Sequence, residues 1–281
     1  MAFEINKPEL FTVPSDARVL KRDLGKIPVL ECKHLGITFG GLHAVEDFNV
    51  TIGPTEISGL IGPNGAGKTT VFNLLTKVYE PTNGVILLDG VDTHGKTTAQ
   101  LSHMGIARTF QNIRLFSNMS VIDNVIAADQ KMKYSMASGI FRTPRYYKEE
   151  RAAKERAMDL LAIFDMEDEA NISAKSLPYG EQRRLEIVRA LATNPKLLLL
   201  DEPAAGMNPS ETAELMENIR NIRDTFNIAI LLIEHDMKLV MGVCEMIGVL
   251  NFGKLIAKGT PEEIQANPTV IEAYLGKQKE A

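Results

Sequence analysis

The sequence is poor in cysteine. Its 281 residues include two cysteines, Cys32 and Cys244, which lie far apart and form no Cys-x-x-Cys pair. We therefore expect both to be buried, reduced thiols of a cytosolic protein rather than parts of a disulfide framework.

The sequence also has no long hydrophobic run. Its longest apolar stretches, "LLLL" (197–200) and "IAILLI" (228–233), fall far short of the about 18 residues that a membrane-spanning helix requires. Residues 1–16 carry acids and prolines and lack the apolar segment of a secretory signal. We expect a soluble chain, for which any membrane role comes through a partner.

No sign of charge predominates. The 31 basic and 36 acidic residues give a formal net charge of −5, and the two signs are interspersed. This pattern gives no basic surface for nucleic acid, and we expect no nucleic-acid partner. With 44% hydrophobic residues, the chain can bury a large core as one large domain or two lobes.

The patterning predicts an α/β protein with a helical insertion. Residues 1–28, with three prolines, predict a loosely ordered extension, and residues 277–281 a short tail. Residues 29–276 form the main domain, which begins with alternating apolar residues typical of strands. Helical periodicity marks residues 69–79, and a charged, helix-rich segment at about 112–184 predicts a helical subdomain.

A phosphate-binding motif follows the predicted strand 57–62. "GPNGAGKT" (62–69) fits the pattern G-x-x-x-x-G-K-[ST] between a strand and a helix. Its glycines allow backbone amides to curl around a phosphate, the lysine neutralises phosphate charge, and the first threonine offers a hydroxyl to Mg²⁺. The predicted nucleotide-binding residues of this loop and the next position are Gly62, Pro63, Asn64, Gly65, Ala66, Gly67, Lys68, Thr69 and Thr70.

Two further apolar strands end in polar residues. "LLLLDEP" (197–203) is typical of a central parallel strand, and its Asp201 can hold magnesium while Glu202 orients or deprotonates a water. "LLIEHDM" (231–237) places His235 at a strand end, where ligands gather in parallel sheets. Two acids that cap the next helix, and a structural histidine, are the alternative interpretations.

Two positions give weaker indications. Gln111, in "GIARTFQN" at the border of the helical insertion, is placed to reach both magnesium and the attacking water. Phe39 offers an aromatic face for adenine, although a core-packing role is about equally consistent with the sequence.

The stretch "SLPYGEQRRLEIVRALA" (176–192) joins a turn to a helix. Pro178 and Gly180 predict a helix that begins near Gly180, with unpaired amides at its first turn. Such a helix end is a ready anion site, although an ordinary helix start also explains it.

The order of these motifs resembles that of the nucleotide-binding subunits of ATP-binding cassette (ABC) transporters, over roughly residues 29–276. The resemblance implies that Phe39 stacks on adenine, that 62–69 is the Walker A loop and that Asp201 is the Walker B aspartate. It implies a P-loop core with a parallel sheet, an N-terminal antiparallel β subdomain and a helical subdomain, with ATP and Mg²⁺ as ligands.

For hydrolysis, the resemblance implies Glu202 as the catalytic glutamate, His235 as the switch histidine and Gln111 as the Q-loop glutamine, which also ligates magnesium. "LPYGEQ" (177–182) is similar to the family signature LSGGQ, whose helix end faces the γ-phosphate bound by a partner subunit. In this segment Gly180 matches a glycine of the signature, and the resemblance implies that it contacts that γ-phosphate.

This signature departs from the family pattern. Pro178 stands where serine is usual, Tyr179 replaces a glycine, and Asn208 replaces the usual D-loop aspartate. "DEPAAGMNP" and the closing "GTPEEIQANPTVIEAYLG" are similar to the ATPases of branched-chain amino-acid importers, in which the signature serine is often altered.

The expected function is ATP hydrolysis that powers import of branched-chain amino acids at the cytoplasmic face of the membrane. The implied partners are permease subunits, a second ATPase subunit (identical or related) and, indirectly, a substrate-binding protein. The ATPase of a urea or lipopolysaccharide transporter is an alternative, and a soluble non-transport ATPase of the same class is another.

Overall fold

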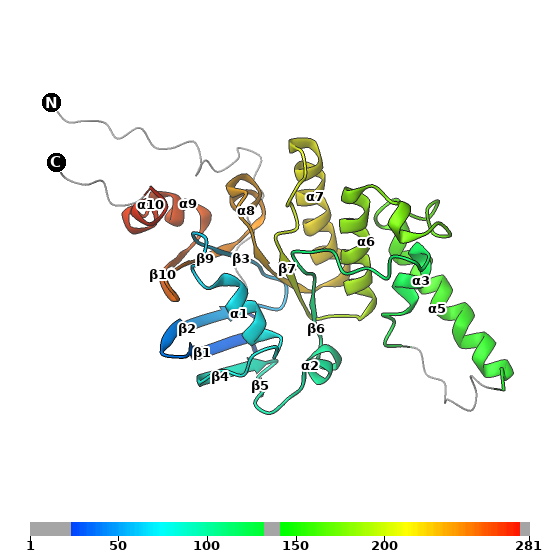
Figure 1. Ribbon diagram of the computed structural model, residues 1–281, viewed down its shortest axis with the longest axis horizontal. Helices are drawn as coiled ribbons and strands as arrows, with labels where there is room; N and C mark the ends of the chain where they lie inside the picture. The colour runs from blue at the N-terminus through cyan, green and yellow to red at the C-terminus, as the bar shows by residue number, and fades with distance from the viewer. Residues whose placement is uncertain (1–23, 132–140, 276–281) are drawn as a thin grey trace.

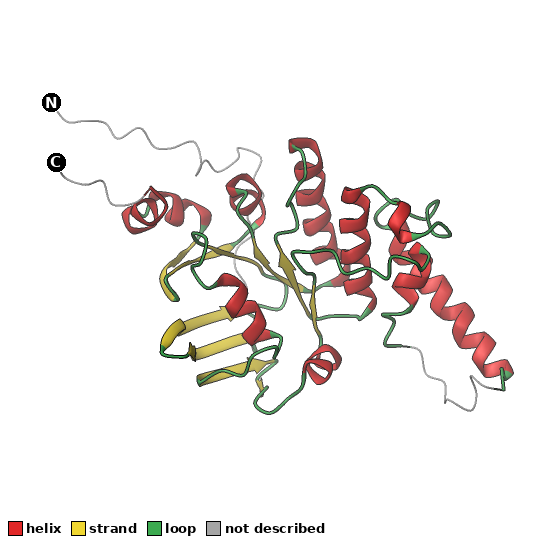
Figure 2. Ribbon diagram, viewed as in Figure 1, coloured by secondary structure: helices red, strands yellow, loops and turns green. Residues whose placement is uncertain are grey.

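Two β-sheets of different kinds share the chain with a helical region (Figures 1 and 2). The computed structural model describes residues 24–131 and 141–275, so most of the predicted extension 1–28 and the tail 277–281 lie outside the described residues. No helix of these two ranges is long and apolar enough to cross a membrane.

The first sheet is antiparallel, and its strand order is β2-β1-β4-β5. Its strands are β1 (Leu30–Phe39), β2 (Leu42–Ile52), β4 (Asn83–Leu88) and β5 (Val91–Asp92). One face of β1 is apolar and buried, with Leu30, Cys32 and Leu35 at most 2% exposed. This sheet is the predicted N-terminal β subdomain.

The second sheet is mostly parallel, in the order β10-β9-β3-β8-β7-β6. Only β10 runs antiparallel, to β9. The strands are β3 (Ile57–Ile61), β6 (Ile106–Arg108), β7 (Leu197–Asp201), β8 (Ala229–Ile233), β9 (Met246–Asn251) and β10 (Lys254–Gly259).

The continuous apolar runs of β7 and β8 reflect burial on both faces of this sheet. Leu197 and Leu199 face a core shared with the antiparallel sheet and α1 (Lys68–Leu75). Leu198 and Leu200 face a second core, which is formed with the helices on the other side. A parallel strand covered by two layers needs apolar side chains at every position.

One group of helices extends from the parallel sheet toward one side of the molecule and forms the helical region, whereas the two C-terminal helices lie toward the opposite side (Figure 1). In the helical region, α3 and α5 pack on each other and on α6. The predicted end of the helical subdomain, at about residue 184, falls inside α6, which continues to Ala192. The helices not yet named are α2 (Thr98–Met104), α3 (Val121–Ile126), α5 (Pro144–Ala162), α6 (Tyr179–Ala192), α7 (Pro209–Phe226), α8 (Met237–Val243), α9 (Pro261–Ala266) and α10 (Pro268–Leu275).

The fold class predicted from the sequence is confirmed, but one helix is shorter than predicted. The helix expected over 69–79 ends at Leu75, because Lys77 adopts a left-handed φ of 55°. Both cysteines are buried and free, as expected. Burial raises the pKa of each thiol.

A buried acidic pair lies where β3 and β9 begin. Glu56 and Glu245 are 1% and 5% exposed, and Arg223 Nη1 donates a hydrogen bond to Glu245 Oε1 at 2.9 Å. Burial, and then the charge of Glu56, outweigh the effect of Arg223 and raise the pKa of Glu245 to about 7. The pair therefore couples stability to pH.

We expect Glu245→Gln to flatten this pH dependence. The carboxyl titrates near 4.5 when unperturbed and near 7 when folded, so its contribution to stability is complete below 4.5 and is lost as the pH rises through 7. Urea denaturation should show the wild-type free energy of unfolding falling by up to about 3 kcal/mol over this range. The exposed-residue control Glu150→Gln should keep the wild-type slope, and a Glu245→Gln variant that also keeps it would refute this role.

Candidate functional site

The phosphate loop, residues 62–69, connects β3 to α1 through a tight backbone turn. Gly62, Gly65 and Gly67 have φ angles of 154°, 79° and 104°. A Cβ atom on Gly62 would lie 2.1 Å from the Leu250 carbonyl oxygen. The backbone conformation therefore favours glycine at all three positions, and close approach of other backbone atoms also requires it at Gly62 and Gly67.

Lys68 begins α1 and turns back over this loop. Its Nζ donates hydrogen bonds to the carbonyl oxygens of Gly62, at 2.6 Å, and Pro63, at 3.0 Å. Burial lowers the pKa of Lys68, against the opposing charges of Glu202 and Asp201. A partly desolvated ammonium beside exposed backbone amides favours a strongly anionic ligand.

A polar cavity of about 650 Å³ opens over the loop. It brings together residues that the sequence separates by more than 170 positions: Asn64, Gly65, Ala66, Gly67, Lys68, Thr69, Thr70, Gln111, Glu202 and His235. Five predicted site residues lie outside this lining: Phe39, Gly62, Pro63, Gly180 and Asp201.

Glu202 lines the cavity, and its carboxylate contacts two other lining residues, His235 and Gln111. His235 Nε2 lies 2.8 Å from its Oε1, and Gln111 Nε2 donates to its Oε2 at 2.9 Å. Glu202 has a left-handed φ of 50°, a strained conformation for a residue with a side chain. Its backbone N–H donates to the Ile233 carbonyl at 2.9 Å, which holds the strained residue against β8.

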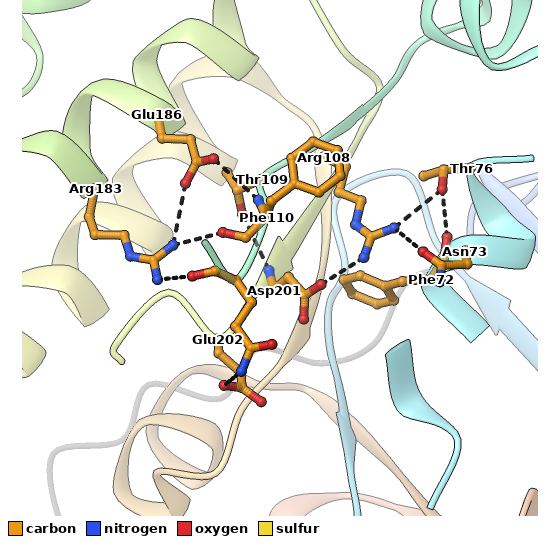
Figure 3. Close-up of polar contacts among 11 residues, drawn as sticks. Phe72, Asn73, Thr76, Arg108, Thr109, Phe110, Arg183, Glu186, Asp201 and Glu202 are labelled. Atoms are coloured by element: carbon orange, nitrogen blue, oxygen red, sulfur yellow. Dashed lines mark hydrogen bonds and ion pairs between the residues drawn. The ribbon is translucent and has the colours of Figure 1, made fainter. Parts of the chain in front are cut away.

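Asp201, directly before it, is buried in an ion pair (Figure 3). Arg108 Nη2 donates to Asp201 Oδ2 at 2.7 Å, and the two side chains are 7% and 4% exposed. Arg108 Nη1 also donates to Asn73 Oδ1 of α1 at 2.8 Å. The rings of Phe72 and Phe110 lie 5.4 and 5.0 Å from the guanidinium carbon. Arg108 therefore links Asp201 to the helix that follows the phosphate loop.

Arg108 was not predicted from the sequence. It stands three residues before Gln111 in the same motif, and an arginine after the apolar "GIA" of an edge strand is the feature that could have marked it. Glu234 was also missed. Buried at 3% exposure, it accepts backbone N–H bonds from Ala204 and His235, and burial raises the pKa of its carboxyl.

Phe39 lies at the end of β1 and is 43% exposed. Its ring meets that of Tyr79 edge-on, with the centroids 5.2 Å apart. This exposure does not fit the core-packing alternative and leaves a ring face available to a flat ligand.

The signature segment, residues 177–182, begins α6, with Pro178 as the N-cap and Tyr179 as the first helical residue. Pro178 and Gly180 line a smaller cavity of about 110 Å³ together with Glu211 of α7. None of its lining residues also lines the cavity over the phosphate loop. Asn208, which replaces the usual aspartate, caps α7 in a reciprocal capping box with Glu211.

The residues near the loop offer oxygen donors for a metal. The predicted ligands Thr69, Gln111 and Asp201 supply a hydroxyl, an amide and a carboxylate. Within residues 24–131 and 141–275, no group of three or more His, Cys, Asp or Glu side chains is placed to hold a metal. The predicted ligands thus provide one carboxylate and two neutral groups. This set fits Mg²⁺ that is also coordinated by a bound phosphate, and it does not fit a metal that is coordinated by protein side chains alone.

These features place the chain in a known class. The sequence pattern of the ABC transporter family matches residues 45–205, and the chain belongs to that family. The pattern described as "Branched-chain amino acid ATP-binding cassette transporter" matches residues 254–280. The predicted family is thus confirmed.

Individual relatives are similar over nearly their whole length. The high-affinity branched-chain amino acid transport ATP-binding protein LivG of Escherichia coli K12 is 50% identical, over 89% of this chain and 98% of the relative. BraF of Pseudomonas aeruginosa, with the same description, is 47% identical over the same shares. The solved ADP conformation of an ATP-binding cassette of an ABC transporter is 28% identical, with a TM-score of 0.77 over 90% of this chain and all of that one.

We expect Arg108→Met to destabilise the protein by about 3–5 kcal/mol, because it leaves the buried Asp201 carboxylate without its partner. Chemical denaturation of the wild type and the variant measures this loss. Arg151 is an exposed arginine of α5, so Arg151→Met should change the free energy of unfolding by less than about 0.5 kcal/mol. Equal stability of the two variants would show that the pair is not needed.

Proposed function

We propose that this chain is the ATP-hydrolysing subunit that powers a membrane importer of branched-chain amino acids. The observation that carries the proposal is the convergence of Lys68, Gln111, Glu202 and His235 on one polar cavity. The 50% identity to LivG and the match of residues 254–280 to the branched-chain pattern support the substrate class.

In this proposal the phosphate loop binds the triphosphate of ATP. Its amides and the N-terminus of α1 surround the β-phosphate, and Lys68 exchanges its bonds to the Gly62 and Pro63 carbonyls for phosphate oxygens. Phe39, with an exposed ring at the end of β1, stacks on adenine. Thr69, Gln111 and Asp201 would hold Mg²⁺, which would neutralise charge on the phosphates.

Glu202 orients and deprotonates the attacking water. His235 and Gln111 each bind one of its carboxylate oxygens, so they fix the direction in which the carboxylate faces the cavity. Positioning and electrostatic stabilisation carry this chemistry, and no covalent intermediate with the protein is needed.

The alternative substrates have weaker support. The lipopolysaccharide export ATP-binding protein LptB of Escherichia coli K12 is 35% identical, over 88% of this chain and 97% of the relative. That identity is well below the 50% to LivG, although both relatives are covered almost completely. A branched-chain amino-acid importer is therefore the better proposal.

We expect Glu202→Gln to keep ATP binding within a few-fold and to lower the turnover number at least about 100-fold, because it keeps the shape and removes the base. Steady-state phosphate release and equilibrium binding of a fluorescent ATP analogue measure the two effects. Lys68→Ala should instead lose binding, and the exposed-residue control Glu150→Gln should change neither. Hydrolysis at the wild-type rate by Glu202→Gln would refute the assignment of the base.

The separation of the two cavities supports an assembly of two ATPase subunits. The cavity over the phosphate loop and the cavity around Pro178 and Gly180 have no lining residue in common. In the proposed assembly two subunits bind head to tail, and the Gly180 amides of each contact the γ-phosphate held by the other. The partner is a second copy or a related ATPase, and both dock on permease subunits at the cytoplasmic face of the membrane.

We expect Glu202→Gln to form a dimer on gel filtration when ATP is present. Pro178→Ser in that background should shift dimer formation to lower protein concentration, since a restored hydroxyl adds about 1.5–3 kcal/mol if it meets a phosphate. The Lys68→Ala/Glu202→Gln control should stay monomeric with ATP. A monomer under every condition, alone or with a candidate partner ATPase, would contradict the two-subunit assembly.

A further inference from the structure

Tyr179 stands in the signature segment where the family pattern has a glycine, and neither the fold nor the proposed reaction accounts for it. It is the first residue of α6, and its side chain is half exposed. Its hydroxyl nevertheless lies inward, where it accepts a hydrogen bond from Arg183 Nη2 at 2.9 Å. The Arg183 guanidinium carbon also lies 5.4 Å from the ring centroid.

The 204–209 loop passes close to the edge of the Tyr179 ring. A Cβ atom on Gly206 would come within 3.3 Å of Tyr179 Cε1, and Gly206 has a φ of 80°. Glycine is therefore the residue that lets this loop pass so close to the ring. An exposed tyrosine fixed at both its hydroxyl and its ring edge is not a freely moving surface side chain.

Arg183 is the buried residue through which Tyr179 can act. Its side chain is 3% exposed. It donates from Nη1 to the Phe110 carbonyl at 2.7 Å and from Nη2 to the Gln111 carbonyl (Figure 3). Arg183 Nη1 also lies 3.4 Å from Glu186 Oε2, and Glu186 Oε1 accepts from the backbone N–H groups of Phe110 and Arg114. The first two turns of α6 thus hold both ends of the 110–114 backbone.

The Arg183 guanidinium already has one donor without an acceptor in the described part of the chain. Its Nε is buried and has no hydrogen-bond partner among the described residues. Removal of the Tyr179 hydroxyl would leave a second Arg183 donor without an acceptor, and the free-energy cost of that donor favours a shift of the side chain toward another acceptor. Because Arg183 holds the Gln111 carbonyl, such a movement displaces the residue whose side chain binds Glu202.

We propose that Tyr179 is a positioning residue for Gln111, acting through the Arg183 guanidinium that holds the Gln111 backbone beside Glu202. This inference rests on the proposed function for its effect on hydrolysis. The hydrogen bonds form one continuous connection from the start of α6 to the proposed base: Tyr179 to Arg183, Arg183 to Gln111, and Gln111 to Glu202.

The test uses Tyr179→Phe, which keeps the ring against Gly206 and removes only the hydroxyl. In the full-length chain we expect the turnover number for ATP to fall about three- to tenfold while KM stays within about twofold, because the phosphate loop is untouched. In a Gln111→Ala background the same substitution should have almost no effect, since a residue that acts through Gln111 cannot act when Gln111 is removed. Tyr147→Phe, which removes the hydroxyl of an exposed tyrosine of α5, is the matched control and should change neither background.

A second measurement does not depend on activity. Hydrogen–deuterium exchange of the nucleotide-free chain should show faster exchange of the Phe110 and Arg114 amides in Tyr179→Phe than in the wild type or Tyr147→Phe. Unchanged turnover together with unchanged exchange would overturn the inference, and so would an equal loss of turnover in the Gln111→Ala background. A wild-type chain that binds ATP without hydrolysing it would instead contradict the proposed function, and the exchange measurement would still decide the role of Tyr179.

Discussion

The parallel register of three strands is the constraint on which the rest of the site depends. Leu60 of β3 and Asp201 of β7 both pair with Ile233 of β8, so the three strands end in one row. The residues that follow, the phosphate loop, Glu202 and the pair Glu234–His235, must therefore emerge at the same edge of the sheet. The apolar runs of β7 and β8 are buried on both faces and are followed at once by Asp201 and Glu234, so a shift of either strand would move a carboxylate into the apolar cores. The position of the polar cavity therefore depends on the packing of the apolar strands that end at it.

The segment that contains Gln111 is bound both by residues of the parallel sheet and α1 and by residues of the helical region. On one side, Arg108 ties it to Asp201 and to α1. On the other side, α6 holds it through Arg183 and Glu186, and Arg189 Nη1 donates to the Arg114 carbonyl at 2.5 Å. This stretch of backbone therefore links the parallel sheet to the helical region beside the cavity.

Much of the site could be predicted from the sequence, because its chemistry follows local rules. The loop 62–69 has a spacing that only a phosphate-binding turn requires, and Glu202 and His235 each follow a strand that is recognisable from its apolar run. Arg108 and Arg183 could not be predicted in the same way, since their importance comes from partners 93 and about 70 positions away.

The end of α1 was also not predicted. The Thr76 hydroxyl donates to the Phe72 carbonyl at 2.8 Å and Lys77 adopts a left-handed φ, although Val78 continues the helical pattern. Whether residues 112–184 form a separate subdomain stays a prediction.

The burial of the two cysteines has a practical consequence for chemical labelling. Cys32 and Cys244 are 2% and 0% exposed, and burial raises the pKa of both thiols, so neither has an accessible thiolate at neutral pH. Because the thiolate is the reactive species, maleimide reagents should leave both residues unmodified in the folded protein. A cysteine introduced on the surface would then be the one reactive thiol of the described chain. Spectroscopic probes can be attached to the helical region and to the parallel sheet without replacing either native residue, and the distance between them can be followed as nucleotide binds.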